Sequence, residues 1–214
     1  MTIDVLERPL LRGTLHAAVF FATVPAAFLL WVNADRAAGR AAAAIYGGAL
    51  VLGFGSSAAY HRLARSARAR RIMQRVDHAM IYVLIAGSYV PICMVALPPH
   101  WGIPLLSAVG AGAILGIVLS FTALVWAKVV CYVLYLVIGW AAVVAAPALL
   151  DNLSGVQIVL IAAGGITYTA GVPVLLLRRP DPWPRIFGYH EVWHLFTVVA
   201  AGLQFAAVTS IVSS

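Results

Sequence analysis

Near the C-terminus, the segment GYHEVWH (residues 188–194) holds two histidines four positions apart, with a glutamate between them. On a helix, His190 and His194 would share one face, where two imidazoles can bind one metal ion. The pattern H-E-x-x-H is also the signature of zinc metalloproteases, in which the glutamate, here Glu191, is the general base. The segment that follows, LFTVVAAGLQFAAVTSIV, is apolar enough to cross a membrane. The motif therefore predicts a metal site but does not by itself define its kind.

Two other short segments carry similar residues at the ends of apolar stretches. Ser57 and His61 are again four positions apart, and Asp77 is followed directly by His78. Ionisable side chains inside membrane spans are costly and usually serve a function. We therefore treat these residues and the histidine pair as one candidate constellation.

The composition indicates which elements must position these side chains. Of the 214 residues, 63% are hydrophobic and 10% are charged, whereas soluble domains have about 25% charged residues. Apolar stretches of roughly 20 residues are long enough to cross a bilayer as helices, and they are too long for the strands of a barrel. We predict an all-α membrane protein, with residues 1–214 forming a single seven-helix transmembrane bundle. The predicted spans lie near residues 14–32, 41–61, 77–97, 103–125, 128–150, 155–177 and 186–212.

The distribution of basic residues predicts the orientation of this bundle. Twelve Lys and Arg residues fall at one side of the predicted spans, and only Arg36 and Arg40 fall at the other. The positive-inside rule then places the N-terminus in the cytoplasm and the C-terminus outside. We expect the basic loops to lie against anionic lipid headgroups and not against nucleic acid. The twelve are Arg8, Arg12, Arg62, Arg65, Arg68, Arg70, Arg71, Arg75, Lys128, Arg178, Arg179 and Arg185.

Two further expectations concern processing and cross-linking. The N-terminal segment MTIDVLERPLLRG carries acidic residues and no cleavage site after an apolar core, so we expect no removable signal peptide. Cys93 and Cys131 fall in spans near opposite membrane faces, so we expect no disulfide between them.

With this topology, the candidate residues of three spans meet at the cytoplasmic face. The second span ends with Ser57 and His61, the third begins with Asp77, and the seventh begins with the histidine pair. Three imidazoles and a water form a catalytic type of zinc site, with one open position. Zinc is favoured because imidazoles dominate the set and thiolates are absent. A nearby carboxylate such as Asp77 could hold or deprotonate the water.

Four remaining polar residues have less defined roles. His78 follows Asp77 by about 100° around the helix, so we expect it to support the site or to be structural. Glu191 is likewise turned away from the face of the histidine pair, towards a neighbouring helix or a headgroup. His16 and His100 have no partner in the pattern and are predicted to lie at the membrane interface.

These segments together resemble the hemolysin III family, the bacterial branch of the progestin and adipoQ receptors. SSAAYHRL (56–63) resembles the family's S-x-x-x-H, and RVDHAMIYVLIAGSYVP (75–91) resembles its Asp-His opening and Ala-Gly-Thr-Tyr-x-Pro block, with Ser88 in place of Thr. GGITYTAGV (164–172) is similar to a sixth-span segment, and GYHEVWHLF (188–196) resembles the closing H-x-x-x-H.

The resemblance implies a seven-helix protein of a bacterial plasma membrane with zinc bound by His61, His190 and His194. It also implies that Asp77 holds the water and that Ser57 lies nearby. Because the wider superfamily includes alkaline ceramidases, the implied chemistry is hydrolysis of a lipid amide or ester at the cytoplasmic leaflet. In that reaction we expect Asp77 to act as the base and Ser57 to donate to the oxyanion.

Two other functions remain open at this stage. One is a non-enzymatic protein with structural zinc, either a sensor of membrane state or a pore-forming hemolysin. A constitutive pore is disfavoured because no span has a run of polar residues through its outer half. The other is an intramembrane protease with Asp77 as third ligand, which would leave His61 without a role.

Overall fold

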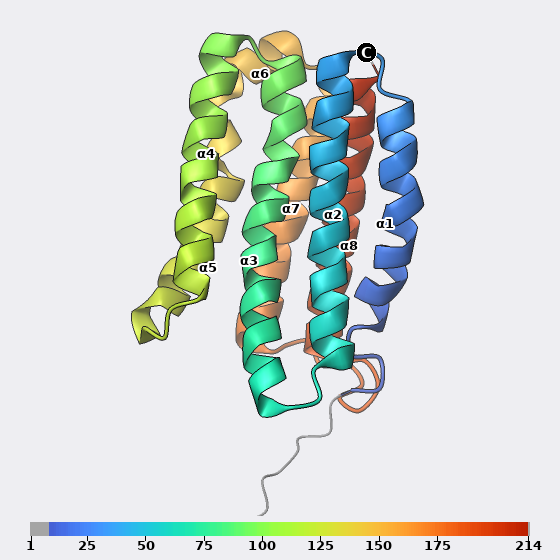
Figure 1. The fold of residues 1–214 in the computed structure, drawn as a ribbon, viewed down its shortest axis with the longest axis vertical. Helices are drawn as coiled ribbons and strands as arrows, with labels where there is room; N and C mark the ends of the chain where they lie inside the picture. The colour runs from blue at the N-terminus through green and yellow to red at the C-terminus, as the bar shows by residue number, and fades with distance from the viewer. Residues whose placement is uncertain (1–8, 214) are drawn as a thin grey trace, which may run out of the picture.

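The computed structural model describes residues 9–213, so Arg8 and the rest of the N-terminal segment before Pro9 lie outside the described residues. Within this range the chain is almost wholly helical, and its only extended pairing is an isolated bridge between Trp183 and Phe187 (Figure 1). The elements are α1 (Thr14–Val32), α2 (Ala37–Leu63), α3 (Ala67–Pro91), a π-helix (Ile92–Ala96), α4 (Pro99–Ser120), α5 (Val125–Gly139), a 3-10 helix (Ala141–Ala145), α6 (Ala146–Asn152), α7 (Gly155–Leu177) and α8 (Tyr189–Val212).

Seven helical segments of this range are long and apolar enough to span a membrane. Five of them are α1, α2, α4, α7 and α8. The third is α3 continued by the π-helix, and the fifth joins α5, the 3-10 helix and α6. The prediction of an all-α protein with seven membrane-spanning helices is thereby confirmed.

The third helix begins earlier than the apolar pattern indicates. We predicted a span from residue 77, but α3 begins at Ala67 and includes the Arg-rich segment that we assigned to a loop. Arg, Ala, Met and Gln are good helix formers, so the helix continues beyond its apolar part. Ser66 caps the N-terminus by accepting a hydrogen bond from the amide of Ala69 at 3.1 Å.

Four other helices also begin at different residues from those predicted. Helix α2 begins at Ala37 and not at residue 41, and α5 begins at Val125 and not at residue 128. The fourth helix begins at Pro99 and not near residue 103, because Pro98 and Pro99 form its first turn, where proline is favoured. The last helix begins at Tyr189 and not at residue 186, because residues 183–187 form a turn.

The packing order brings the two ends of the chain together. Consecutive helices pack against one another from α1 to α5, and α7 packs against α8. The last helix also contacts α1, α2 and α3, as the adjacent blue and red ribbons of Figure 1 show. This arrangement places the start of α8 beside the start of α1 and the end of α2.

Small residues allow α1, α2 and α3 to approach closely. A Cβ added to Gly47 of α2 would lie 2.7 Å from the Cβ of Ala27, and one added to Gly87 of α3 would lie 2.6 Å from the Cβ of Ala49. In membranes, where lipid tails are as apolar as side chains, such contacts let helices associate through van der Waals packing. Cys93 and Cys131 are both buried and free, so the expectation of no disulfide is confirmed.

Candidate metal centre

Three histidines from two helices converge at one end of the bundle, the lower end in Figure 1, which we call the histidine end. His61 comes from the last turn of α2, and His190 and His194 come from the first turns of α8. One potential ligand atom of each lies within 4.8 Å of the others. The Nε2 atoms of His61 and His190 are 3.3 Å apart. The sequence reasoning proposed these three residues as ligands, and the fold brings them together.

The donor set fits a zinc ion. A tetrahedral ion with Zn–N distances of about 2.0–2.1 Å needs its nitrogens roughly 3.3 Å apart, as are the two Nε2 atoms. His194 is 3% exposed, and its Nδ1 has no hydrogen-bond partner among the described residues. A buried polar atom without a partner is costly, which is consistent with a metal ligand.

Ser57 and Asp77 lie beside this cluster but are not part of it. Ser57 is buried one turn before His61 on α2, and its hydroxyl lies near the carboxyl group of half-buried Asp77 on α3. The three histidines form a group that includes no carboxylate among the described residues. This favours His61 over Asp77 as third ligand, in contrast to the metalloprotease hypothesis.

His16 is the main residue of this region that sequence reasoning missed. We expected it at the membrane interface, but it is 7% exposed and lies inside the bundle. Its ring stacks on the ring of His194 with centroids 3.7 Å apart and planes 9° apart. The predicted topology already placed the first turn of α1 at the same membrane face as the histidine pair. That placement could have identified His16 as a neighbour of the cluster.

Comparisons with known proteins show the family of this chain. The family model described as "Haemolysin-III related" matches residues 5–205. This chain belongs to the hemolysin III family. It is 29% identical to "Hemolysin-3" of Bacillus cereus over 199 residues, which cover 90% of this chain and 86% of that protein. It is 31% identical to "Hemolysin-3 homolog" of Bacillus subtilis (strain 168) over 164 residues, which cover 77% and 74%. It is a multi-pass bacterial membrane protein.

In this hemolysin III protein, Glu191 is not a member of the histidine group. It is 1% exposed and forms an ion pair with Arg12, with Oε1 2.7 Å from the guanidinium Nε. Its other oxygen accepts a hydrogen bond from the amide of Gly188 at 2.9 Å, which caps the start of α8. Both oxygens of the Glu191 carboxylate therefore have a structural role, one in the ion pair and the other in the helix cap. Arg12, which we had grouped with the headgroup-facing basic residues, is its partner.

The segment before α1 covers the cluster. The amides of Leu10 and Leu11 donate to the carbonyls of Arg185 and Ile186 at 2.9 and 3.0 Å, joining this segment to the loop before α8. Gly13 has φ of 75°, and a Cβ there would lie 2.4 Å from the Cβ of His61. Only glycine allows the chain to turn so close to this histidine.

The remaining histidines lie outside the cluster. His78 is half-buried on α3, and its backbone carbonyl accepts a hydrogen bond from the Tyr135 hydroxyl at 2.9 Å. His100 is exposed in the first turn of α4, at the other end of the bundle.

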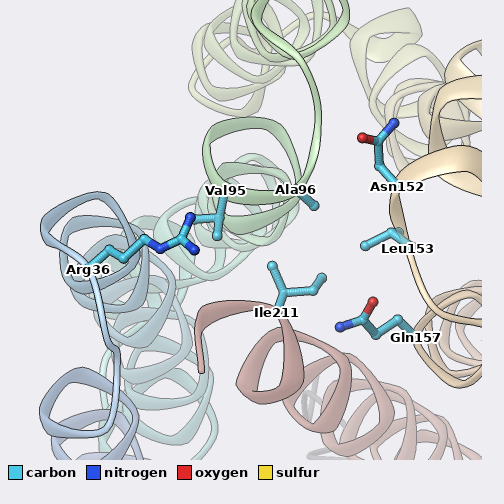
Figure 2. A pocket seen from close by; sticks show the side chains of 7 residues that line it. All are labelled: Arg36, Val95, Ala96, Asn152, Leu153, Gln157 and Ile211. Carbon is cyan, nitrogen blue, oxygen red and sulfur yellow. The ribbon is translucent and has the colours of Figure 1, made fainter. Parts of the chain in front are cut away.

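A pocket of about 280 Å³ lies at that other end, which we call the pocket end. Figure 2 shows the side chains of Arg36, Asn152 and Gln157 around it, with apolar residues between them. Its lining includes no histidine, cysteine or carboxylate, so it offers none of the ligands of the histidine end.

Proposed function

We propose that this protein binds zinc through His61, His190 and His194 and hydrolyses an acyl linkage, amide or ester, of a membrane lipid. The observation that carries the proposal is the convergence of three imidazoles inside an apolar bundle, with Ser57 and Asp77 next to them. Three neutral imidazoles leave a fourth position open, which is typical of catalytic zinc and not of structural zinc.

Zinc held by His61, His190 and His194 would supply a Lewis acid that polarises a carbonyl and lowers the pKa of water. Asp77 serves as the acid–base group, taking a proton from the attacking water and returning one to the leaving amine or alcohol. Ser57 lies next to the Asp77 carboxyl. The stacked ring of His16 fixes the orientation of His194.

The substrate class follows from the surroundings of the cluster. The described chain consists largely of apolar helices, so a substrate that reaches the cluster between them carries apolar tails. The excess of basic residues at the histidine end supports a cytoplasmic position for the cluster. Lipids of the cytoplasmic leaflet are then the substrates, and their acyl tails contribute binding.

The direct test is hydrolysis of fluorescent ceramide and a panel of acyl amides and esters by purified protein in lipid nanodiscs. We expect turnover by the zinc-loaded wild type and loss of turnover in His194→Ala. His100→Ala is the matched control, because it removes an exposed histidine at the pocket end and should keep full activity. Zinc-loaded, folded protein that hydrolyses nothing on the panel would rule out the hydrolase.

The names of the two Bacillus relatives favour a second candidate, lysis of membranes by a protein in which zinc is structural. Dye release from liposomes separates the two functions. Release that persists in Asp77→Asn, together with no lipid hydrolysis, supports the lytic function. Liposomes that stay intact exclude it.

A further inference from the structure

His16 makes two side-chain hydrogen bonds and a ring stack beside the cluster, and neither the ligand set nor the acid–base pair accounts for it. Its Nδ1 lies 2.8 Å from Oγ of Ser57, and its Nε2 lies 3.0 Å from Oγ1 of Thr197. Its flat face lies against His194. One side chain of α1 thus connects α2, which carries Ser57, to α8, which carries two histidines of the cluster.

The direction of these hydrogen bonds follows from counting protons. Thr197 donates its hydroxyl proton to the carbonyl of His194 at 2.8 Å, a bond that threonines commonly make to the preceding helical turn. Its oxygen can therefore only accept from His16, so the proton of a neutral His16 sits on Nε2. The unprotonated Nδ1 of His16 must then accept a hydrogen bond, and the Ser57 hydroxyl donates its single proton to it.

We propose that His16 is a positioning residue of this centre: it fixes the direction of the Ser57 hydroxyl while its ring holds His194 in place. With its proton given to His16, the Ser57 hydroxyl has only lone pairs left for any other neighbour. Ser57 therefore does not donate to an oxyanion. This consequence rests on the proposed function.

The tautomer of His16 gives a test that needs neither substrate nor turnover. We suggest ¹⁵N NMR of histidine-labelled protein in nanodiscs, with the His16 signals assigned by their loss in His16→Phe. We expect the Nε2–H tautomer in the wild type and loss of this fixed tautomer in Thr197→Val. Thr209→Val is the matched control, since Thr209 also bonds a carbonyl of α8 but is remote from the cluster, and it should leave the signals unchanged.

The Nδ1–H tautomer in the wild type would overturn the proposal. So would a Thr197→Val spectrum that is no different from that of Thr209→Val. Because this measurement does not depend on hydrolysis, a protein that shows the Nε2–H tautomer but no turnover would refute the hydrolase and leave the positioning role intact.

Kinetics and zinc content distinguish positioning from simple packing. His16→Phe keeps a stacked ring but loses both hydrogen bonds, so we expect retained zinc and a kcat lower by about 10–100-fold, with KM unchanged. The double variant His16→Phe/Ser57→Ala should be no slower than Ser57→Ala alone, since both changes break the same chain. Losses that multiply in the double variant would show that the two residues act independently and would contradict the proposal.

Discussion

The two ends of the bundle both carry polar side chains, but they use them differently. At the histidine end, side chains from α1, α2 and α8 bond one another, and the segment before α1 covers them. At the pocket end, Gln157 is satisfied by Ser154 and Ser210, which starts α7 and fastens it to α8. Arg36 lies at the pocket and forms no ion pair among the residues that the structure describes (Figure 2).

This difference separates a functional constellation from an ordinary polar helix end. Arginines and amides near headgroups are well solvated and need no particular geometry. Buried imidazoles and carboxyl groups need defined partners, because each unpaired polar atom inside the bundle is costly. Substitutions should therefore have large effects at the histidine end and small effects at the pocket end.

The largest effect is expected from His61→Ala. This variant removes the only member of the cluster that α2 contributes, so zinc should fall from about one ion per chain to a small fraction. Metal analysis of purified protein measures this directly. Zinc that stays stoichiometric without His61 would show that the ligands are not these three histidines. The expected difference in sensitivity between the histidine end and the pocket end would then be wrong.

The second-largest effect is expected from Glu191→Gln, on the stability of the protein. It leaves the largely buried Arg12 guanidinium without its counter-ion, and breaking such a pair costs about 3 kcal/mol of folding free energy. Thermal unfolding in detergent should show a lower Tm than the wild type. Zinc content at low temperature should stay unchanged, since Glu191 is not a ligand. Zinc loss without loss of stability would instead make Glu191 part of the metal site.

A smaller effect is expected from Gly13→Ala. The positive φ of Gly13 costs an alanine about 1 kcal/mol, and the added methyl group meets His61. We expect weaker zinc binding by competition with a chelator. The control is Gly110→Ala, where an added Cβ has open space around it, and it should bind zinc as the wild type does.

The smallest effect is expected from Arg36→Gln at the pocket end. Its stability should change by less than about 0.5 kcal/mol, with normal zinc content and normal turnover. Measurement of all three quantities on the same preparation tests this. A loss of turnover with normal zinc content would reveal a role for the pocket end in the reaction. Substitutions at both ends would then affect function, contrary to the expected difference.

Much of the architecture could be predicted from the sequence, because the bilayer imposes a simple length and polarity rule. Seven apolar stretches predicted seven helices, and the alternation of spans placed Ser57, His61, Asp77 and the histidine pair at one end. The helix starts were less predictable. Ala67 and Pro99 begin helices outside the apolar windows, since local caps and propensities set those ends rather than hydropathy.

Sequence by itself determined the number of spans, the candidate ligands and the end of the bundle where they meet, because these depend only on helix period and span alternation. Only the tertiary structure decided which side chains touch. It paired Glu191 with Arg12, stacked His16 on His194 and linked His16 to Ser57. Such contacts depend on how α8 rotates and packs between α1, α2 and α3, and no pattern along one helix encodes the rotation of its neighbours.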